Sequence, residues 1–182
     1  MPTVFEKEYN YDLLENITVP KKYTSDNLRW KLLSLDIDWV ISTPDESVFW
    51  EVSTSSLSYD AIAELVYLTS MWINITINSY WSSNAKSYWE LLYIFNKFRL
   101  VDNLKSPVPF VSQSLKWKNL LTYLWHNKIS PKDVVCLDDE YSGYKALIDF
   151  WNFIKVDPMV WLTSMVREQV EKLFIDNNKK FI

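Results

Sequence analysis

Residues 61–77, AIAELVYLTSMWINITI, and residues 88–98, YWELLYIFNKF, form the stretch that decides the predicted fold. In both segments apolar side chains recur at steps of three and four residues, which places them on one face of a helix. Ser58 precedes the first segment as an N-cap candidate, and Asp60 falls in the first turn, where a carboxylate is favourable. Two successive amphipathic helices bury their apolar faces most simply against each other. The stretch therefore predicts a helical hairpin over residues 58–104.

One part of this hairpin carries a conflicting pattern. Residues 73–78, INITIN, alternate strictly between apolar and polar side chains, and the apolar ones are β-branched. Such alternation is typical of a half-buried strand. The segment also continues the helical spacing without a glycine or a proline, and on this ground we predict that it is helical.

The chain of 182 residues contains a single glycine, Gly143. Phosphate-binding loops and dinucleotide-binding turns need several glycines, because the backbone must adopt positive φ and approach the phosphate closely. The favoured turns of β-hairpins also depend on glycine, which argues against an all-β fold. The predicted fold class is therefore all-α, an irregular and partly orthogonal bundle of about six to eight helices around one aromatic-rich core.

This bundle is predicted to be one domain over residues 1–182, with residues 1–23 as an N-terminal arm and residues 177–182 as a frayed tail. N-cap residues, prolines at helix starts and apolar spacing locate the other helices. Outside the hairpin they are predicted at residues 24–39, 43–52, 113–127, 144–154 and 157–174, and a short helix or turn that starts near Ser130 is predicted to lead to Asp138.

Cys136 and His126 are the only cysteine and the only histidine, so an intrachain disulfide and a zinc site built from these residue types are excluded. A Ser-His-Asp triad would have to use His126. We expect instead that His126 is a partly exposed residue at a helix end and that Cys136 is a small buried hydrophobe.

The net charge of −4 is unevenly distributed along the chain. Residues 1–90 carry 6 basic and 13 acidic side chains, residues 97–132 carry 7 and 1, and residues 133–182 carry 6 and 9. The basic middle segment suggests a surface for an acidic protein partner or, less readily given the pI near 5.1, for nucleic acid. The simpler alternative is a solvated helix face that pairs with the acidic half of the same chain. The candidate partner-binding residues are Lys116, Trp117, Lys118, Lys128 and Lys132.

Asp138, Asp139 and Glu140 form the densest group of carboxylates in the sequence. Adjacent carboxylates offer the oxygen ligands that Mg²⁺ prefers, and one of them could act as a general base. The alternative is a solvated loop that caps the following helix. Because no second inward-facing carboxylate pair is evident from spacing, these residues are weak metal candidates, and no cofactor is expected.

With glycine-rich loops and thiol or histidine chemistry excluded, the ten tryptophans and eleven tyrosines point to binding, since aromatic residues are enriched at interfaces. The leading prediction is a non-catalytic helical protein that binds another protein, as an adaptor, an inhibitor or a neutralising partner would. The alternatives are a nucleic-acid or anionic-ligand binder that uses the basic segment, and a carboxylate- and Mg²⁺-dependent enzyme. No signal sequence or apolar run long enough to cross a bilayer is visible, so a soluble cytoplasmic protein is expected.

Overall fold

The computed structural model describes residues 28–42, 57–140 and 152–179 and has a parallel β-sheet at its centre. The sheet has four strands in the order β2-β1-β3-β4, and all three neighbouring pairs are parallel. The strands are β1 (Leu32–Leu35), β2 (Asn74–Ile77), β3 (Val134–Asp138) and β4 (Asn152–Lys155). The predicted all-α bundle is therefore wrong, and the fold is α/β.

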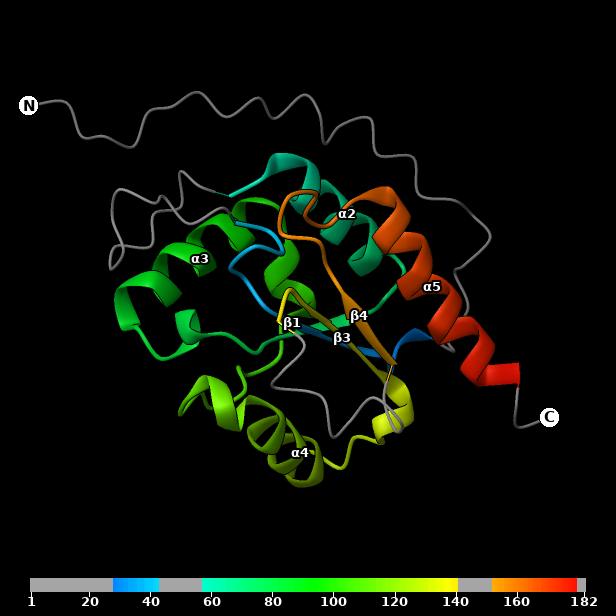
Figure 1. Cartoon of the computed structure of the whole chain (residues 1–182). Helices are drawn as coiled ribbons and strands as arrows, with labels where there is room; N and C mark the ends of the chain where they lie inside the picture. Colours follow the sequence, from blue (N-terminus) through cyan, green and yellow to red (C-terminus); the bar gives the residue numbers. More distant parts are fainter. Residues whose placement is uncertain (1–27, 43–56, 141–151, 180–182) are drawn as a thin grey trace, which may run out of the picture.

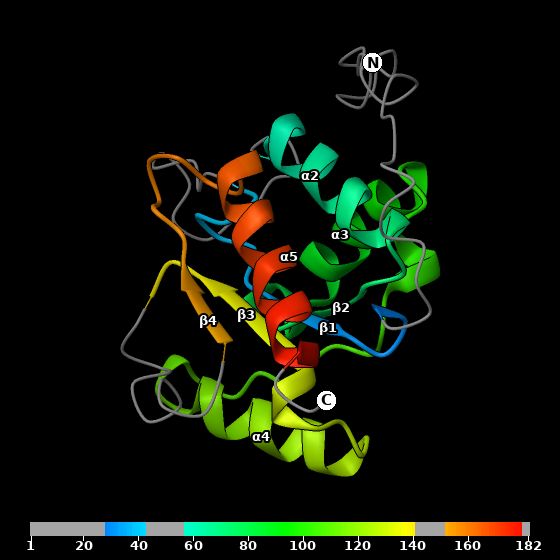
Figure 2. The ribbon, with the colours of Figure 1, turned by 90° about the vertical axis from the view of Figure 1, so that its right-hand side faces the viewer.

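In the described part of the chain, four α-helices cover the two faces of this sheet in three layers (Figures 1 and 2). They are α2 (Tyr59–Ser70), α3 (Ala85–Lys97), α4 (Lys116–His126) and α5 (Ser164–Lys179). In Figure 2, α2, α3 and α5 lie on one side of the strands and α4 lies on the other.

Alternating side chains of the strands supply both hydrophobic cores. In β1, Leu33 and Leu35 belong to the larger core, which includes buried apolar residues of α2, α3 and α5. Leu32 faces the opposite way, into a smaller core with Leu120 and Leu124 of α4. Because parallel strands are buried on both faces, β1 and β3 appear in the sequence as short apolar runs without a clear period-two pattern.

The predicted hairpin is correct in its helices and wrong in its connection. The side chain of Ser58 caps α2, accepting from the Ala61 N–H at 3.3 Å, and α3 covers most of the second predicted helix. The first helix stops at Ser70, however, and β2 follows. The strand-like alternation in residues 73–78 was the correct signal, and its apolar side chains pack in the larger core.

The remaining predictions had mixed outcomes. The helix over residues 113–127 is confirmed by α4, which the 3-10 turn Gln113–Leu115 precedes. The short helix or turn predicted to lead from Ser130 to Asp138 is a 3-10 turn only over Pro131–Asp133, and β3 follows it. The helix over residues 24–39 is wrong where the structure describes it, because β1 lies there. The last helix begins at Ser164 instead of at Pro158.

Some predictions fall outside the described residues. These are the arm at residues 1–23, the helix at residues 43–52 and most of the helix at residues 144–154, whose described end is β4. Within the described part of the chain, no helix is both long and apolar enough to cross a membrane.

The strand order locates the place where a site can form. From β1 the chain moves to β2 on one side, and it later returns to β3 and β4 on the other side of β1. Ligands of open parallel sheets bind where this direction changes, outside the carboxyl ends of the two central strands. Here that point lies between the ends of β1 and β3.

Candidate active site

Two carboxylates follow β1 at the carboxyl edge of the sheet, Asp36 and Asp38. Asp36 is buried, and its Oδ1 accepts a hydrogen bond from the N–H of Ile37 at 2.8 Å. The Asp36 N–H donates to the Leu137 carbonyl of β3 at 3.0 Å, so the sheet itself fixes the position of this residue. A buried carboxylate is costly unless it is paired, which directs attention to its neighbours.

A second pair of carboxylates stands at the end of β3. Asp138 is its last residue and has no exposed surface, and Asp139 is half-buried. Asp138 Oδ1 accepts from the Glu140 N–H at 2.9 Å, which closes a tight turn after the strand. The side chain of Glu140 is exposed.

Lys116, the first residue of α4, joins the two strand ends. It is 1% exposed, and its Nζ lies 2.5 Å from Asp36 Oδ2 and 2.5 Å from Asp138 Oδ2. Burial opposes the charged form of Lys116, but the two carboxylates outweigh burial and raise the pKa of its ammonium. A single cation from the α4 layer therefore bridges carboxylates from two neighbouring strands.

The charges around this lysine do not balance. Ligand oxygens of Asp36, Asp138 and Asp139 all lie within 4.8 Å of one another, so three carboxylates face one ammonium. Burial, and next the charge of Asp36, raise the pKa of Asp138 and of Asp139. Hard carboxylate oxygens are the donors that Mg²⁺ prefers, and a divalent cation would compensate this excess negative charge. The residues present therefore fit a magnesium ion.

Asp38 lies beside this group but has a different environment. Burial, and to a smaller extent the charge of Asp36, raise its pKa to about 6, although a hydrogen bond from Trp81 acts in the opposite direction. That bond joins the indole Nε1 of Trp81 to Asp38 Oδ1 at 2.8 Å. A carboxyl group with a pKa near neutrality can both give and take a proton at physiological pH.

The backbone around Asp38 forms a tight turn. Trp39 has φ 59°, in the left-handed region where a bulky side chain is a genuine outlier, and its N–H donates to the Ser42 carbonyl at 2.6 Å. The Ser42 N–H donates in turn to the Ile37 carbonyl at 3.0 Å. Strained backbone of this kind persists where the surrounding structure holds it, and it is concentrated at functional sites.

The end of β2 adds uncharged polar groups at the same edge. Asn78 and Ser79 are buried there, and the Asn78 N–H donates to the Leu35 carbonyl, one residue before Asp36. Their amide and hydroxyl groups extend the polar lining of the edge beyond the charged cluster.

The structure separates the residues predicted to bind a partner. Lys116 lies in the carboxylate cluster, and Trp117 packs against the smaller core. Lys118, Lys128 and Lys132 are exposed, with the last two beyond the far end of α4. Of the predicted metal candidates, Asp138 and Asp139 lie in the cluster, whereas Glu140 contributes its backbone N–H to the turn.

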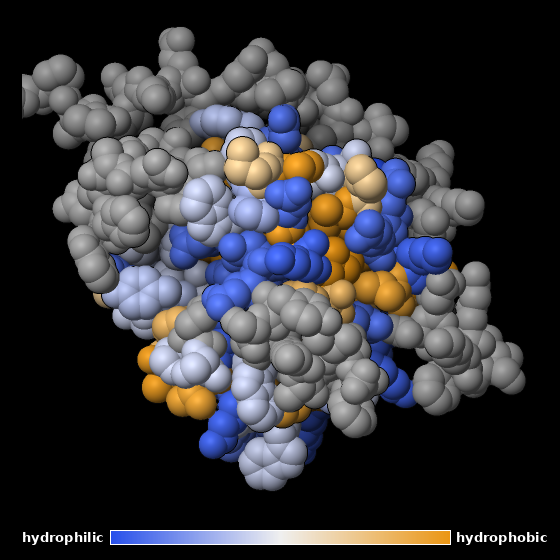
Figure 3. Space-filling view, viewed as in Figure 1, coloured by the Kyte–Doolittle hydropathy of each residue, from blue (hydrophilic) through white to orange (hydrophobic). Residues whose placement is uncertain are grey.

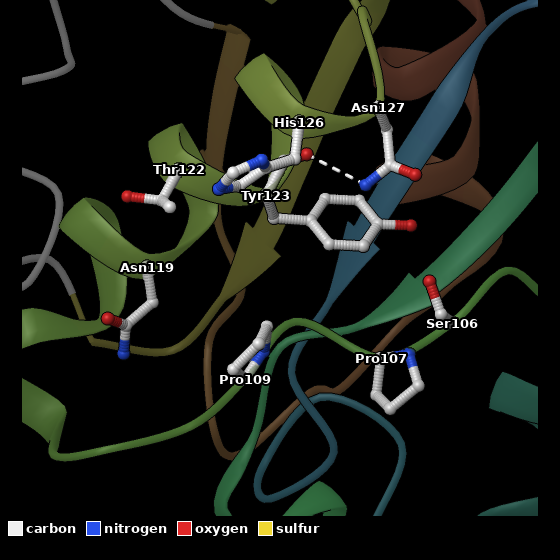
Figure 4. A pocket seen from close by; sticks show the side chains of 8 residues that line it. All are labelled: Ser106, Pro107, Pro109, Asn119, Thr122, Tyr123, His126 and Asn127. Carbon is white, nitrogen blue, oxygen red and sulfur yellow. Dashed lines mark hydrogen bonds between the residues drawn. The ribbon is translucent and has the colours of Figure 1, made fainter.

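His126 and Cys136 are where the sequence placed them. His126 is the exposed last residue of α4, and Cys136 is buried in β3, where burial raises the pKa of its thiol. His126 lines a pocket of about 400 Å³ together with Tyr123, Ser106, Pro107 and Pro109, on the α4 side of the sheet (Figure 4). None of the clustered carboxylates lines this pocket, so it is separate from the candidate site.

The surface seen from the viewpoint of Figure 1 is mixed. Hydrophilic residues form a band across its middle, with hydrophobic areas on either side (Figure 3). The strongly exposed tryptophans in the described residues come from separate elements: Trp89 from α3, Trp125 from α4, and Trp30 and Trp72 from the turns before β1 and β2.

Sequence reasoning missed Asp36, Asp38 and Trp81. The signal for the two aspartates was present, because an apolar run at residues 32–35 is followed directly by Asp-Ile-Asp. The same run also fits one face of the helix predicted at residues 24–39, and in a helix the residues that follow it have no special position. Nothing in the sequence alone singles out Trp81 among ten tryptophans.

The buried cluster overturns the prediction of a non-catalytic protein that acts by binding another protein. A binding scaffold has no need to bury several like charges, which cost stability, whereas an active site does so to tune its groups. Of the alternatives, the carboxylate- and Mg²⁺-dependent enzyme agrees best with the cluster.

Comparison with known proteins shows a distant structural resemblance. No protein-family model matches the chain, and no curated protein matches it significantly. One solved structure that resembles it is that of a putative 3-deoxy-D-manno-octulosonate 8-phosphate phosphatase from Vibrio cholerae. The identity is 12% and the TM-score 0.47, over 90% of this chain and 93% of the other. A likeness at this level supports no conclusion about function, and the candidate site is defined by its own residues alone.

Proposed function

We propose that this protein is a Mg²⁺-dependent phosphohydrolase that transfers a phosphoryl group to Asp36 and then to water. The observation that carries the proposal is the buried cluster in which Lys116 bridges Asp36 and Asp138 beside Asp139. A nucleophile, a lysine and a set of magnesium ligands in one place are the parts that phosphoryl transfer requires.

Asp36 is the best candidate for the nucleophile. Carboxylates serve as nucleophiles in enzymes that form an aspartyl phosphate. Asp36 is held by the sheet on its backbone and by Lys116 on its side chain, so its oxygens are fixed in position. A fixed nucleophile avoids much of the entropic cost of the bimolecular step.

Lys116, together with a Mg²⁺ ion that Asp138 and Asp139 would help to hold, would offset the negative charge of the phosphate. An anionic carboxylate and an anionic phosphate ester repel each other, so cations must stand between them. Lys116 supplies one charge, and lysine binds phosphate well as a point charge. Asp36, Asp138 and Asp139 would hold Mg²⁺, which when bound would neutralise charge on the phosphoryl oxygens.

Asp38 is suited to act as the general acid in the first step and as the general base in the second. In the first step a bond forms between an Asp36 oxygen and phosphorus, the ester bond breaks, and Asp38 gives its proton to the leaving oxygen. In the second step Asp38 takes a proton from water, the water oxygen bonds to phosphorus, and the bond to Asp36 breaks. The products are an alcohol and inorganic phosphate, and both aspartates return to their initial state.

Substitution of the nucleophile tests the proposal. With Mg²⁺ present, the wild-type chain is expected to hydrolyse para-nitrophenyl phosphate, and Asp36→Asn is expected to lower kcat by about 10³-fold or more, because the attacking oxygen is replaced by an amide. Acid-quenched wild-type protein should carry a phosphate label that hydroxylamine removes, as an acyl phosphate requires.

The matched control is Asp102→Asn, which makes the same change at an exposed position. It should leave kcat and the phosphate label unchanged. Full activity in the Asp36→Asn variant, or wild-type hydrolysis that is indifferent to removal of divalent cations, would refute the proposed mechanism.

A further inference from the structure

Trp81 is a large aromatic side chain with no exposed surface, and its only polar atom, the indole nitrogen, forms a hydrogen bond with Asp38. Its Nε1 donates to Asp38 Oδ1 at 2.8 Å, across 43 residues of sequence. An indole N–H can only donate, so it specifies an acceptor oxygen at this position. Because Oδ1 accepts this bond, we expect the proton of the neutral Asp38 carboxyl to be on Oδ2.

The turn that carries Trp81 is anchored on several sides. It is the 3-10 turn η4 (Tyr80–Ser82), which follows β2 and packs against α3. Ser82 Oγ donates to the Ser79 carbonyl at 2.7 Å and lies 3.3 Å from the Val108 carbonyl, which ties the turn to the neighbouring segment. The ring itself lies in the larger core, so the position of Nε1 is set by packing.

The other partner, Asp38, has a backbone that is held by hydrogen bonds. The turn through Trp39 and Ser42 holds the main chain of Asp38, and the Leu162 N–H donates to the Val40 carbonyl at 2.9 Å. Such bonds leave rotation about the side-chain torsions as the remaining freedom of the carboxyl group. The hydrogen bond from the indole N–H restricts this rotation of the Asp38 carboxyl.

We propose that Trp81 is a positioning residue that orients the Asp38 carboxyl so that its second oxygen delivers the proton to the leaving group. This inference rests on the proposed function. Trp81 touches neither substrate nor metal and acts through Asp38 alone. Its loss should therefore matter in proportion to how much the leaving group needs a proton.

The test compares Trp81→Phe with wild type on two phosphate esters in the presence of Mg²⁺. Glycerol 2-phosphate has an alkoxide leaving group that requires protonation, whereas the nitrophenolate of para-nitrophenyl phosphate departs without it. We expect kcat/KM to fall about tenfold or more for the first ester and less than about twofold for the second, since general acid catalysis contributes about 10² to 10⁴-fold. A general loss of folded protein would lower both values equally.

Two further variants complete the design. Trp89→Phe makes the same change at an exposed position of α3 and should alter neither ester. The double variant Asp38→Asn/Trp81→Phe should hydrolyse glycerol 2-phosphate no more slowly than Asp38→Asn alone, because the indole has then lost the group through which it acts.

The outcomes separate this inference from the function on which it rests. Equal losses on both esters in Trp81→Phe, or a further loss in the double variant, would overturn the positioning role while leaving phosphatase activity and its dependence on Asp36 intact. Absence of Mg²⁺-dependent hydrolysis in the wild type would instead refute the proposed function, and the inference with it.

Discussion

At the scale of single residues, Asp38 shows how a buried carboxyl group in a candidate active site lowers the stability of the folded chain at neutral pH. Its pKa is raised from 3.8 to about 6, chiefly by burial. The folded chain therefore holds a proton that the unfolded chain releases more readily. The contribution of Asp38 to stability is fully present below about pH 4 and is lost as the pH rises through about 6.

Asp38→Asn tests this linkage, because the amide remains neutral at every pH. Relative to wild type, the variant should gain up to about 3 kcal/mol in free energy of unfolding between pH 4 and pH 8, the equivalent of about two pKa units. Urea denaturation in the presence of EDTA at several pH values measures the difference. The exposed Asp102→Asn should show almost no such trend, and a constant difference for Asp38→Asn would contradict the expectation.

At the scale of elements, the sequence predicted helices better than strands. The start of α2 follows from apolar spacing and from the cap Ser58, and most of α3 follows from apolar spacing, whereas the end of α2 at Ser70 was predicted too late. β1 and β3 are four and five residues long and buried on both sides, so their apolar runs match a helix face equally well. The scarcity of glycine was misleading, because parallel strands are joined by helices and need no tight hairpin turn.

The cap of α2 gives a prediction at this scale. Ser58→Ala removes the oxygen that accepts from the Ala61 N–H and leaves a helical donor unsatisfied. The free energy of unfolding should fall by about 1 kcal/mol, which thermal or urea unfolding can detect. Ser114→Ala is the control, since Ser114 is exposed and should change stability by less than about 0.5 kcal/mol. Equal effects of the two substitutions would show that Ser58 does not act as a cap.

At the scale of the whole molecule, the site depends on contacts that sequence alone does not reveal. Asp138 and Asp139 are adjacent in the sequence, whereas Asp36 and Lys116 are separated by 80 residues. Their meeting follows from the strand order, in which β3 returns to the side of β1 opposite β2. With an all-α interpretation no sheet edge existed on which to bring them together.

Metal binding should stabilise the folded chain as a whole. An ion that binds only the folded state at about 100 times its Kd adds about 2.7 kcal/mol to the free energy of unfolding, so Mg²⁺ should raise the Tm of the wild type. Asp139→Asn should show a smaller increase, because it removes one carboxylate from the cluster while disturbing little of the core. An unchanged wild-type Tm, or an increase in Asp139→Asn equal to that of wild type, would contradict a metal site here.

The residues of the candidate site come from two parts of the chain, one before and one after a single connecting segment. Asp36, Asp38 and Trp81 all precede the segment at residues 105–112, while Lys116, Asp138 and Asp139 all follow it. A protease cut in that segment would yield one fragment with the nucleophile and the proton donor and another with the cationic partner and the remaining ligands. Neither piece would hold the chemistry by itself, and hydrolysis of an ester would become a reporter of their reassembly.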